Sequence, residues 1–80
     1  MTRLEIEQTV NQFLLEELEI DEALIKSSSR LKEDLRIDSL DFVDIAVLVE
    51  EHFGFKIKIE EFKKVLTLED FYTYIEQRMK

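Results

Sequence analysis

Cysteine is absent from this 80-residue chain, proline and tryptophan are also absent, and glycine occurs once. Without cysteine the protein can form neither a disulfide nor a thiolate metal site, and it has no cysteine nucleophile. Small β-rich domains need more turn-forming residues than one glycine and no proline supply, so the composition favours helices. Any thiol chemistry of this protein would need a thiol from an added group.

The chain also lacks a long apolar run. No stretch approaches membrane-spanning length, and no N-terminal run resembles a signal peptide, so we expect a cytoplasmic protein without membrane insertion. Basic residues are outnumbered, and the net charge is −8 at pH 7. This acidity argues against nucleic acid as a partner because phosphates would repel the protein. Eighty residues provide a core for one domain, so we expect residues 1–80 to form a single, monomeric domain.

The first half of the chain predicts one helix followed by a long loop. Thr2-Arg3-Leu4-Glu5 is a capping-box pattern that begins the helix. Apolar residues then recur at helical spacing as far as about Leu18, namely Ile6, Val10, Phe13, Leu14 and Leu18. From Glu19 to Ile37 the periodicity breaks, which indicates a loop with a short helical turn near Glu22. We expect scattered apolar residues to hold this loop against the core: Ile20, Leu24, Ile25, Leu31, Leu35 and Ile37.

The second half predicts three more helices. One runs from about Ser39 to His52 and stops at Phe53-Gly54, because glycine favours a helix C-terminus. Its expected core face consists of Phe42, Ile45, Ala46, Val49 and Phe53. A short helix is expected over Glu60–Lys64, with Phe62 and Val65 facing inward. A second capping pattern, Thr67-Leu68-Glu69-Asp70, begins a final helix that buries Phe71 or Tyr72, Ile75 and Met79. The predicted fold is all-α, a four-helix bundle with three main helices and one short helix.

Asp38-Ser39-Leu40-Asp41 is the most informative segment of the chain. Asp38 is suited to cap the second helix, with Asp41 at its third position, which leaves the Ser39 side chain facing water. A helix N-terminus carries partial positive charge and unpaired N–H groups, so a phosphodiester on Ser39 would be electrostatically favourable there. Such a short motif is by itself more often a plain helix start, so the surrounding residues have to decide.

A second stripe on this helix mixes acidic and apolar residues: Leu40, Asp41, Asp44, Val47, Leu48 and Glu51. This mixture fits a docking surface, because charge steers the encounter and apolar groups supply short-range contact. The alternative is an ordinary solvated face with some exposed aliphatic residues.

The segment from Leu31 to Asp41 resembles the prosthetic-group attachment site of acyl carrier proteins, and the resemblance covers most of the chain. The best-matched residues are Leu35, Asp38, Ser39, Leu40, Asp41, Val43, Glu50, Glu51, Phe53 and Ile57, with Thr67–Asp70 and Tyr74-Ile75 in the last helix. The resemblance implies that Ser39 carries 4′-phosphopantetheine from coenzyme A, flanked by Asp38 and Leu40. It also implies a carrier of acyl thioesters with the acyl-carrier bundle fold, and not an enzyme.

The resemblance further implies partners. A phosphopantetheinyl transferase would modify Ser39, and ketosynthase, acyltransferase or acyl-ligase enzymes would dock basic patches on the second-helix stripe. Arg36 and Lys58 replace a frequent glycine and a frequent proline of the family, and Lys56, Lys63 and Lys64 make the third-helix region basic. The pathway therefore stays open between fatty-acid, specialised lipid and polyketide biosynthesis. Ile59-Glu60-Glu61-Phe62 resembles D-alanyl carrier proteins, so a D-alanyl or peptidyl carrier is an alternative.

We also expect the interior to hold an acyl chain between Phe42, Ala46, Phe53, Phe62, Val65 and Leu66. The main alternative to a carrier is an acidic helical interaction domain without a prosthetic group. An enzyme is disfavoured because His52, the only histidine, lies about 20 Å along the helix from Ser39. Asp41 and Asp44 have no further catalytic group beside them, and the acidic loop lacks the ligand spacing of an EF-hand calcium site.

Overall fold

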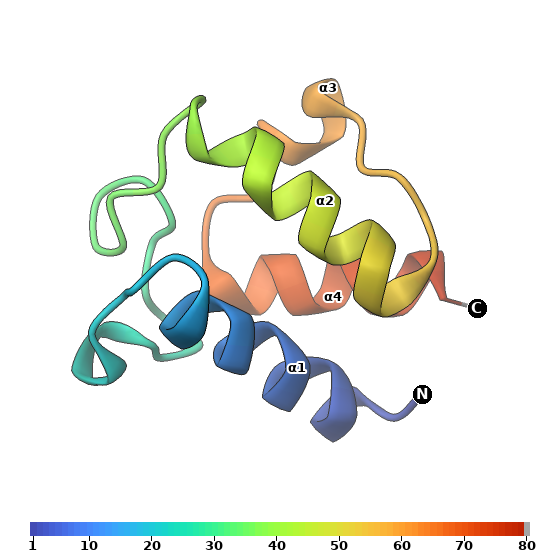
Figure 1. Ribbon diagram of the computed structural model, residues 1–80, viewed down its shortest axis with the longest axis horizontal. Helices are drawn as coiled ribbons and strands as arrows, with labels where there is room; N and C mark the ends of the chain where they lie inside the picture. The colour runs from blue at the N-terminus through green and yellow to red at the C-terminus, as the bar shows by residue number, and fades with distance from the viewer. Residues whose placement is uncertain (80) are drawn as a thin grey trace.

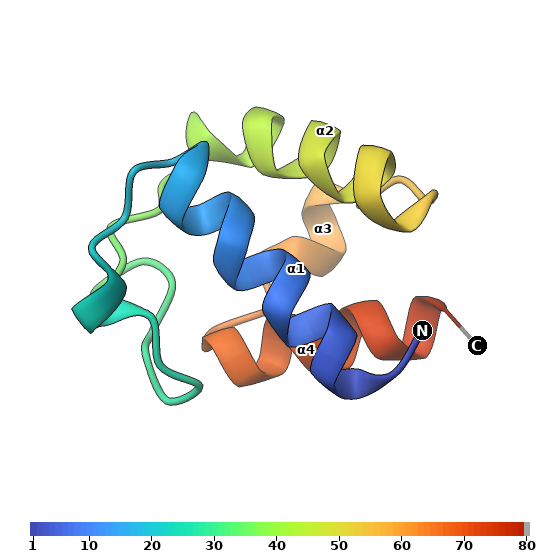
Figure 2. The same cartoon turned by 60° about the horizontal axis from the view of Figure 1, so that its bottom comes forward.

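The computed structural model describes residues 1–79 and confirms the predicted all-α bundle. Its elements are α1 (Arg3–Glu16), a 3₁₀ turn η1 (Glu22–Leu24), α2 (Asp41–Phe53), the short α3 (Ile59–Phe62) and α4 (Leu68–Arg78). The connection between α1 and α2 lies at one end of the bundle, and the N-terminus and the end of α4 lie at the opposite end (Figures 1 and 2). Within residues 1–79, no helix combines the length and the apolar character that crossing a membrane requires.

Both predicted capping boxes are present. The Thr2 hydroxyl accepts a hydrogen bond from the Glu5 N–H at 3.2 Å, and the Glu5 carboxylate accepts one from the Thr2 N–H at 2.8 Å. Thr67 and Asp70 make the same pair of bonds at the start of α4, at 3.1 and 3.2 Å. Each box satisfies two backbone donors that a helix start leaves unpaired, so these sequences locate both helix starts.

Helix α1 ends at Glu16, two residues before the expected end at Leu18. Glu19 has a φ of 54°, and this left-handed conformation is incompatible with continuing the helix. Leu18 packs only partly against the core. The expected core face of α1 is otherwise confirmed by the burial of Ile6, Val10, Phe13 and Leu14.

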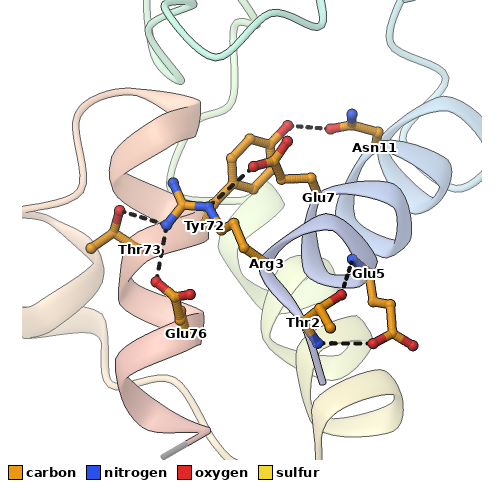
Figure 3. Close-up of polar contacts among 8 residues, drawn as sticks. All are labelled: Thr2, Arg3, Glu5, Glu7, Asn11, Tyr72, Thr73 and Glu76. Carbon is orange, nitrogen blue, oxygen red and sulfur yellow. Dashed lines mark hydrogen bonds and ion pairs between the residues drawn. The ribbon is translucent and has the colours of Figure 1, made fainter.

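Polar contacts join α1 to α4 (Figure 3). The Tyr72 hydroxyl donates to the Asn11 side-chain oxygen, and the Arg3 guanidinium donates to Thr73 and Glu76, both at 3.2 Å. Phe71 and Tyr72 are both buried, where the sequence suggested one of the two. Met79, the residue that follows the last residue of α4, is exposed, contrary to expectation.

Backbone hydrogen bonds attach the long connection to the segment before α4. Leu31 N–H donates to the Leu66 carbonyl and Leu68 N–H to the Ser29 carbonyl, both at 2.9 Å. The predicted turn near Glu22 is confirmed as η1, and Leu31, Leu35 and Ile37 are buried. The prediction for Leu24 is wrong. Leu24 is the last residue of η1, a turn with no buried residue, and its side chain is exposed to solvent.

Candidate functional site

The turn before α2 is built around Asp38. Its Oδ1 accepts the predicted backbone hydrogen bonds, from the N–H groups of Leu40 at 2.9 Å and Asp41 at 3.2 Å, although the N-cap position of α2 is Leu40 and not Asp38. In return the Asp38 N–H donates to Oδ2 of Asp41 at 3.1 Å. Helix α2 begins two residues later than predicted, so Asp41 is its first residue and not its third, although Leu40 already has helical dihedral angles. Ser39 therefore lies in the turn that enters the helix.

Ser39 is exposed in this turn, between a capping residue and an exposed leucine. The neighbouring carboxylates of Asp38 and Asp41 accept backbone N–H groups within the turn. The Ser39 side chain thus stands at the positive end of α2 and is accessible from solvent, as the sequence predicted.

A pocket of about 600 Å³ opens beside Ser39. Its apolar walls come from the long connection, from α2 and from the α3 region, and are formed by Leu31, Ile37, Phe42, Ile59, Phe62, Val65 and Leu66. Polar side chains also line it: Arg30, Lys32, Glu33, Asp38 and Lys63 in addition to Ser39. The Phe42 and Phe62 rings are in contact, with centroids 5.1 Å apart and their planes tilted by 53°. An apolar pocket next to an accessible hydroxyl can shelter an apolar group attached there.

Two of the six residues that we expected to surround an acyl chain do not line the pocket. Ala46 and Phe53 lie one and three turns along α2 from Phe42, away from Ser39, and Phe53 is buried in the core. Arg30, Lys32 and Lys63 were not among the expected lining residues. Sequence patterns could not have placed them, because they meet only when the long connection folds against the α3 region.

The exposed face of α2 differs from the predicted stripe at two positions, Leu48 and Val43. Leu40 is 80% exposed and Val47 50%, and Asp44 and Glu51 also face solvent, while Asp41 is half-buried. Leu48 is 9% exposed and belongs to the core. At about 100° per residue, Leu48 lies only about 60° from buried Ile45, so the core face includes it.

Val43 belongs to this face and was missing from the predicted set. It is 63% exposed, and it lies three residues after Leu40 and four before Val47. Residues at these spacings are neighbours on one side of a helix. The helical spacing of the three aliphatic residues could therefore have identified Val43 from the sequence.

His52 is exposed near the far end of α2, where its ring stacks on Phe13 with centroids 5.8 Å apart. The contact joins α2 to α1, so the only histidine of the chain has a packing partner well removed from Ser39.

Comparisons with known proteins show the family of this chain. The family described as "Phosphopantetheine attachment site" matches residues 8–75. The acyl carrier protein of Phytoplasma mali is 39% identical over 72 residues, covering 90% of this chain and 86% of the relative. Those of Rickettsia typhi and Rickettsia prowazekii are each 40% identical over 73 residues, covering 91% of this chain and 85% of the relative. The chain therefore belongs to the acyl carrier protein family, whose members are carriers equipped with 4′-phosphopantetheine and not enzymes.

Proposed function

We propose that Ser39 is the residue that receives 4′-phosphopantetheine, and that the chain thereby carries acyl groups for biosynthetic enzymes. The observation that carries this proposal is the position of Ser39, exposed at the head of α2 and beside an apolar pocket. When attached, the group supplies the thiol that the chain itself lacks, so that acyl groups are held as thioesters. It would be transferred from coenzyme A by a phosphopantetheinyl transferase.

The residues present fit this group. The N-terminus of α2 favours the negative charge of a phosphodiester, and the exposed Ser39 offers access for a transferase. Asp38 and Asp41 place their carboxylates on backbone N–H groups of the turn, which limits their repulsion of the phosphate. Asp38 and Leu40 are the neighbours of the attachment point on either side.

We propose the pocket beside Ser39 as the shelter for an acyl chain. Leu31, Phe42 and Phe62 provide apolar walls that a chain can contact in place of water. The chemical shifts of Phe42 and Phe62 should then change progressively along a series of acyl lengths. Identical shifts for unacylated and acylated forms would contradict this role.

The docking surface proposed for partner enzymes is the exposed face of α2. It consists of Leu40, Asp41, Val43, Asp44, Val47 and Glu51, and buried Leu48 is no longer part of it. Ketosynthases, acyltransferases or acyl ligases with basic patches would meet its acids at long range and its aliphatic residues at contact. The shared core of the described residues supports a single domain, which we propose to act as a monomer.

The lysines near α3, where the chain departs from the common pattern of the family, bear on the biosynthetic pathway that it serves. Lys56, Lys58, Lys63 and Lys64 are all exposed, so they give the α3 region a basic surface beside the acidic face of α2. We infer that partner enzymes of this chain accommodate that positive charge. Fatty-acid, specialised lipid and polyketide biosynthesis are the candidate pathways, with a D-alanyl or peptidyl carrier as the alternative within carriers.

The decisive experiment is intact-mass measurement before and after incubation with coenzyme A and a broad-specificity phosphopantetheinyl transferase. The parent protein should gain one phosphopantetheine, and Ser39→Ala should gain none. Ser28→Ala, which changes another exposed serine in the long connection, is the matched control and should be modified like the parent. If folded parent protein gains no mass with several transferases, the carrier proposal fails. The result would then favour an acidic interaction domain without a prosthetic group.

A further inference from the structure

Helix α3 is too short to be stable without contacts to the rest of the protein. It spans four residues, Ile59–Phe62, and isolated helices of this length are not stable in water because nucleation is unfavourable. Only a few backbone bonds define it, among them Phe62 N–H to the Lys58 carbonyl and Lys63 N–H to the Ile59 carbonyl, both 3.0 Å. Side-chain contacts with the rest of the bundle must therefore determine where α3 lies.

One side of α3 forms a wall of the pocket. Ile59 and Phe62 both line it. The Phe62 ring packs between two others, with centroids 5.1 Å from Phe42 and 5.8 Å from Phe71. Because Phe62 has a ring on each side, extra room for a longer acyl chain has to come from displacement of α3.

Another side of α3 is held by a polar cluster on α4. Oε1 of Glu61 accepts hydrogen bonds from the Tyr74 hydroxyl at 2.7 Å and from the Arg78 guanidinium at 3.1 Å. The same guanidinium donates to the Tyr74 hydroxyl at 3.2 Å, so the three side chains contact one another pairwise. The hydrogen bond from Tyr74 lowers the pKa of Glu61, which keeps the carboxylate ionised.

The cluster also includes the connection from α2 to α3. The Arg78 guanidinium lies 4.9 Å from the centroid of the Phe55 ring, and Phe55 meets the edge of Tyr74 at 6.2 Å. Phe55 precedes α3, Glu61 lies within it, and Tyr74 and Arg78 lie near the end of α4. These contacts connect α3 and the segment before it to α4.

We propose that Glu61 is a positioning residue that holds α3 in place through Tyr74 and Arg78 and thereby limits the acyl chain length that the pocket admits. The proposal rests on the carrier function proposed above. Glu61 and Phe62 are adjacent, so α3 cannot carry Phe62 outward without moving Glu61 away from its partners on α4. Cargo length is therefore governed by a cluster on the side of α3 facing α4, which the cargo itself does not touch.

The first arm of the test needs no prosthetic group. Amide hydrogen exchange of Phe62 and Lys63 is measured in the unmodified protein by NMR. Glu61→Ala and Tyr74→Phe should each speed exchange of these two amides several-fold while core amides of α1 keep their rates. Glu60→Ala is the matched control, because it makes the same change on the same helix at an exposed residue outside the cluster. Equal exchange rates in Glu61→Ala and Glu60→Ala would overturn the proposal.

The second arm of the test measures how the rate of thioester cleavage depends on the length of the attached acyl chain. Butanoyl and decanoyl groups are loaded on the holo protein, and the rates of thioester cleavage by hydroxylamine are compared. Glu61→Ala should slow cleavage of the decanoyl form several-fold relative to the butanoyl form, because a displaced α3 admits the longer chain. Glu60→Ala should keep the parent ratio. The same change for both lengths, or faster decanoyl cleavage, would refute a role in chain length.

The two proposals fail in different ways. A folded parent protein that no transferase modifies at Ser39 would defeat the carrier proposal, while the exchange arm would still decide whether Glu61 positions α3. Normal modification combined with unchanged exchange would defeat the Glu61 proposal alone.

Discussion

Asp38 and Asp41 hydrogen-bond each other's backbone: the Asp38 N–H donates to Oδ2 of Asp41 at 3.1 Å, and the Asp41 N–H donates to Oδ1 of Asp38 at 3.2 Å. This reciprocal pair closes the turn that displays Ser39 between them. It also gives the Asp41 carboxylate a structural role at the helix start. The hypothesis of Asp41 and Asp44 as an acid–base pair thereby loses its structural motivation.

Asp38→Ala should destabilise the protein by about 1 kcal/mol, because it leaves the N–H groups of Leu40 and Asp41 without their acceptor. Asp38→Asn keeps a side-chain oxygen and should stay near the parent. Urea unfolding measures both variants. Equal stability of the alanine and asparagine variants would show that the cap contributes nothing.

Val47 and Leu48 are adjacent but should respond oppositely. Leu48→Ala removes a core side chain and should cost about 2–5 kcal/mol of stability. Val47→Ala alters an exposed residue and should stay within about 0.5 kcal/mol of the parent, yet slow modification by the transferase. Urea unfolding and mass-based modification kinetics separate the two effects. A stable Leu48→Ala protein with impaired docking would restore the stripe predicted from the sequence.

Arg36→Gly should stabilise the protein by about 0.5–1 kcal/mol. Arg36 has a φ of 58°, and a side chain is strained in this left-handed region whereas glycine is not. The greater freedom of glycine in the unfolded chain offsets part of the gain. Lys32→Gly is the control in the same connection, because within residues 1–79 only Glu19 and Arg36 are non-glycine residues with positive φ. Lys32→Gly should lower the urea midpoint of unfolding. A similar decrease of the midpoint in Arg36→Gly would contradict the prediction.

Tyr72 should make stability fall at alkaline pH. Burial is the main cause that raises its pKa to about 12 from the ordinary value of 10.0, and the Glu7 charge adds to the increase. The folded state therefore favours the neutral phenol. The resulting stability is complete below pH 10 and is lost as pH rises through about 12.

Urea midpoints across the alkaline range should accordingly fall more steeply in the parent than in Tyr72→Phe. The lysines and Tyr74 are present in both proteins, so their contribution to the change of stability with pH is common to both curves. Parallel curves for the two proteins would mean that the Tyr72 phenol titrates alike in the folded and unfolded states.

Local patterns in the sequence predicted several features correctly. Thr2 and Thr67 cap helices as expected, and Asp38 accepts backbone hydrogen bonds at the turn before α2, because such bonds depend on residues only two or three positions away. The core faces of α1 and α2 also follow from helical spacing, apart from Leu48, which is buried against expectation, and Phe42 and Ala46, which are only partly buried. A pattern assigns the centre of a helix face reliably, but the width of the buried stripe depends on what packs against it.

The sequence by itself determined the helices, their caps and the exposed serine at the head of α2, because neighbouring residues encode each of them. Only the tertiary structure decided the pocket and the position of α3. The pocket forms where the long connection, α2 and the α3 region meet, and Glu61 contacts Tyr74 and Arg78 from the next helix. Such contacts join residues far apart in the chain, and the spacing of residues within one segment carries no record of which distant side chain lies opposite.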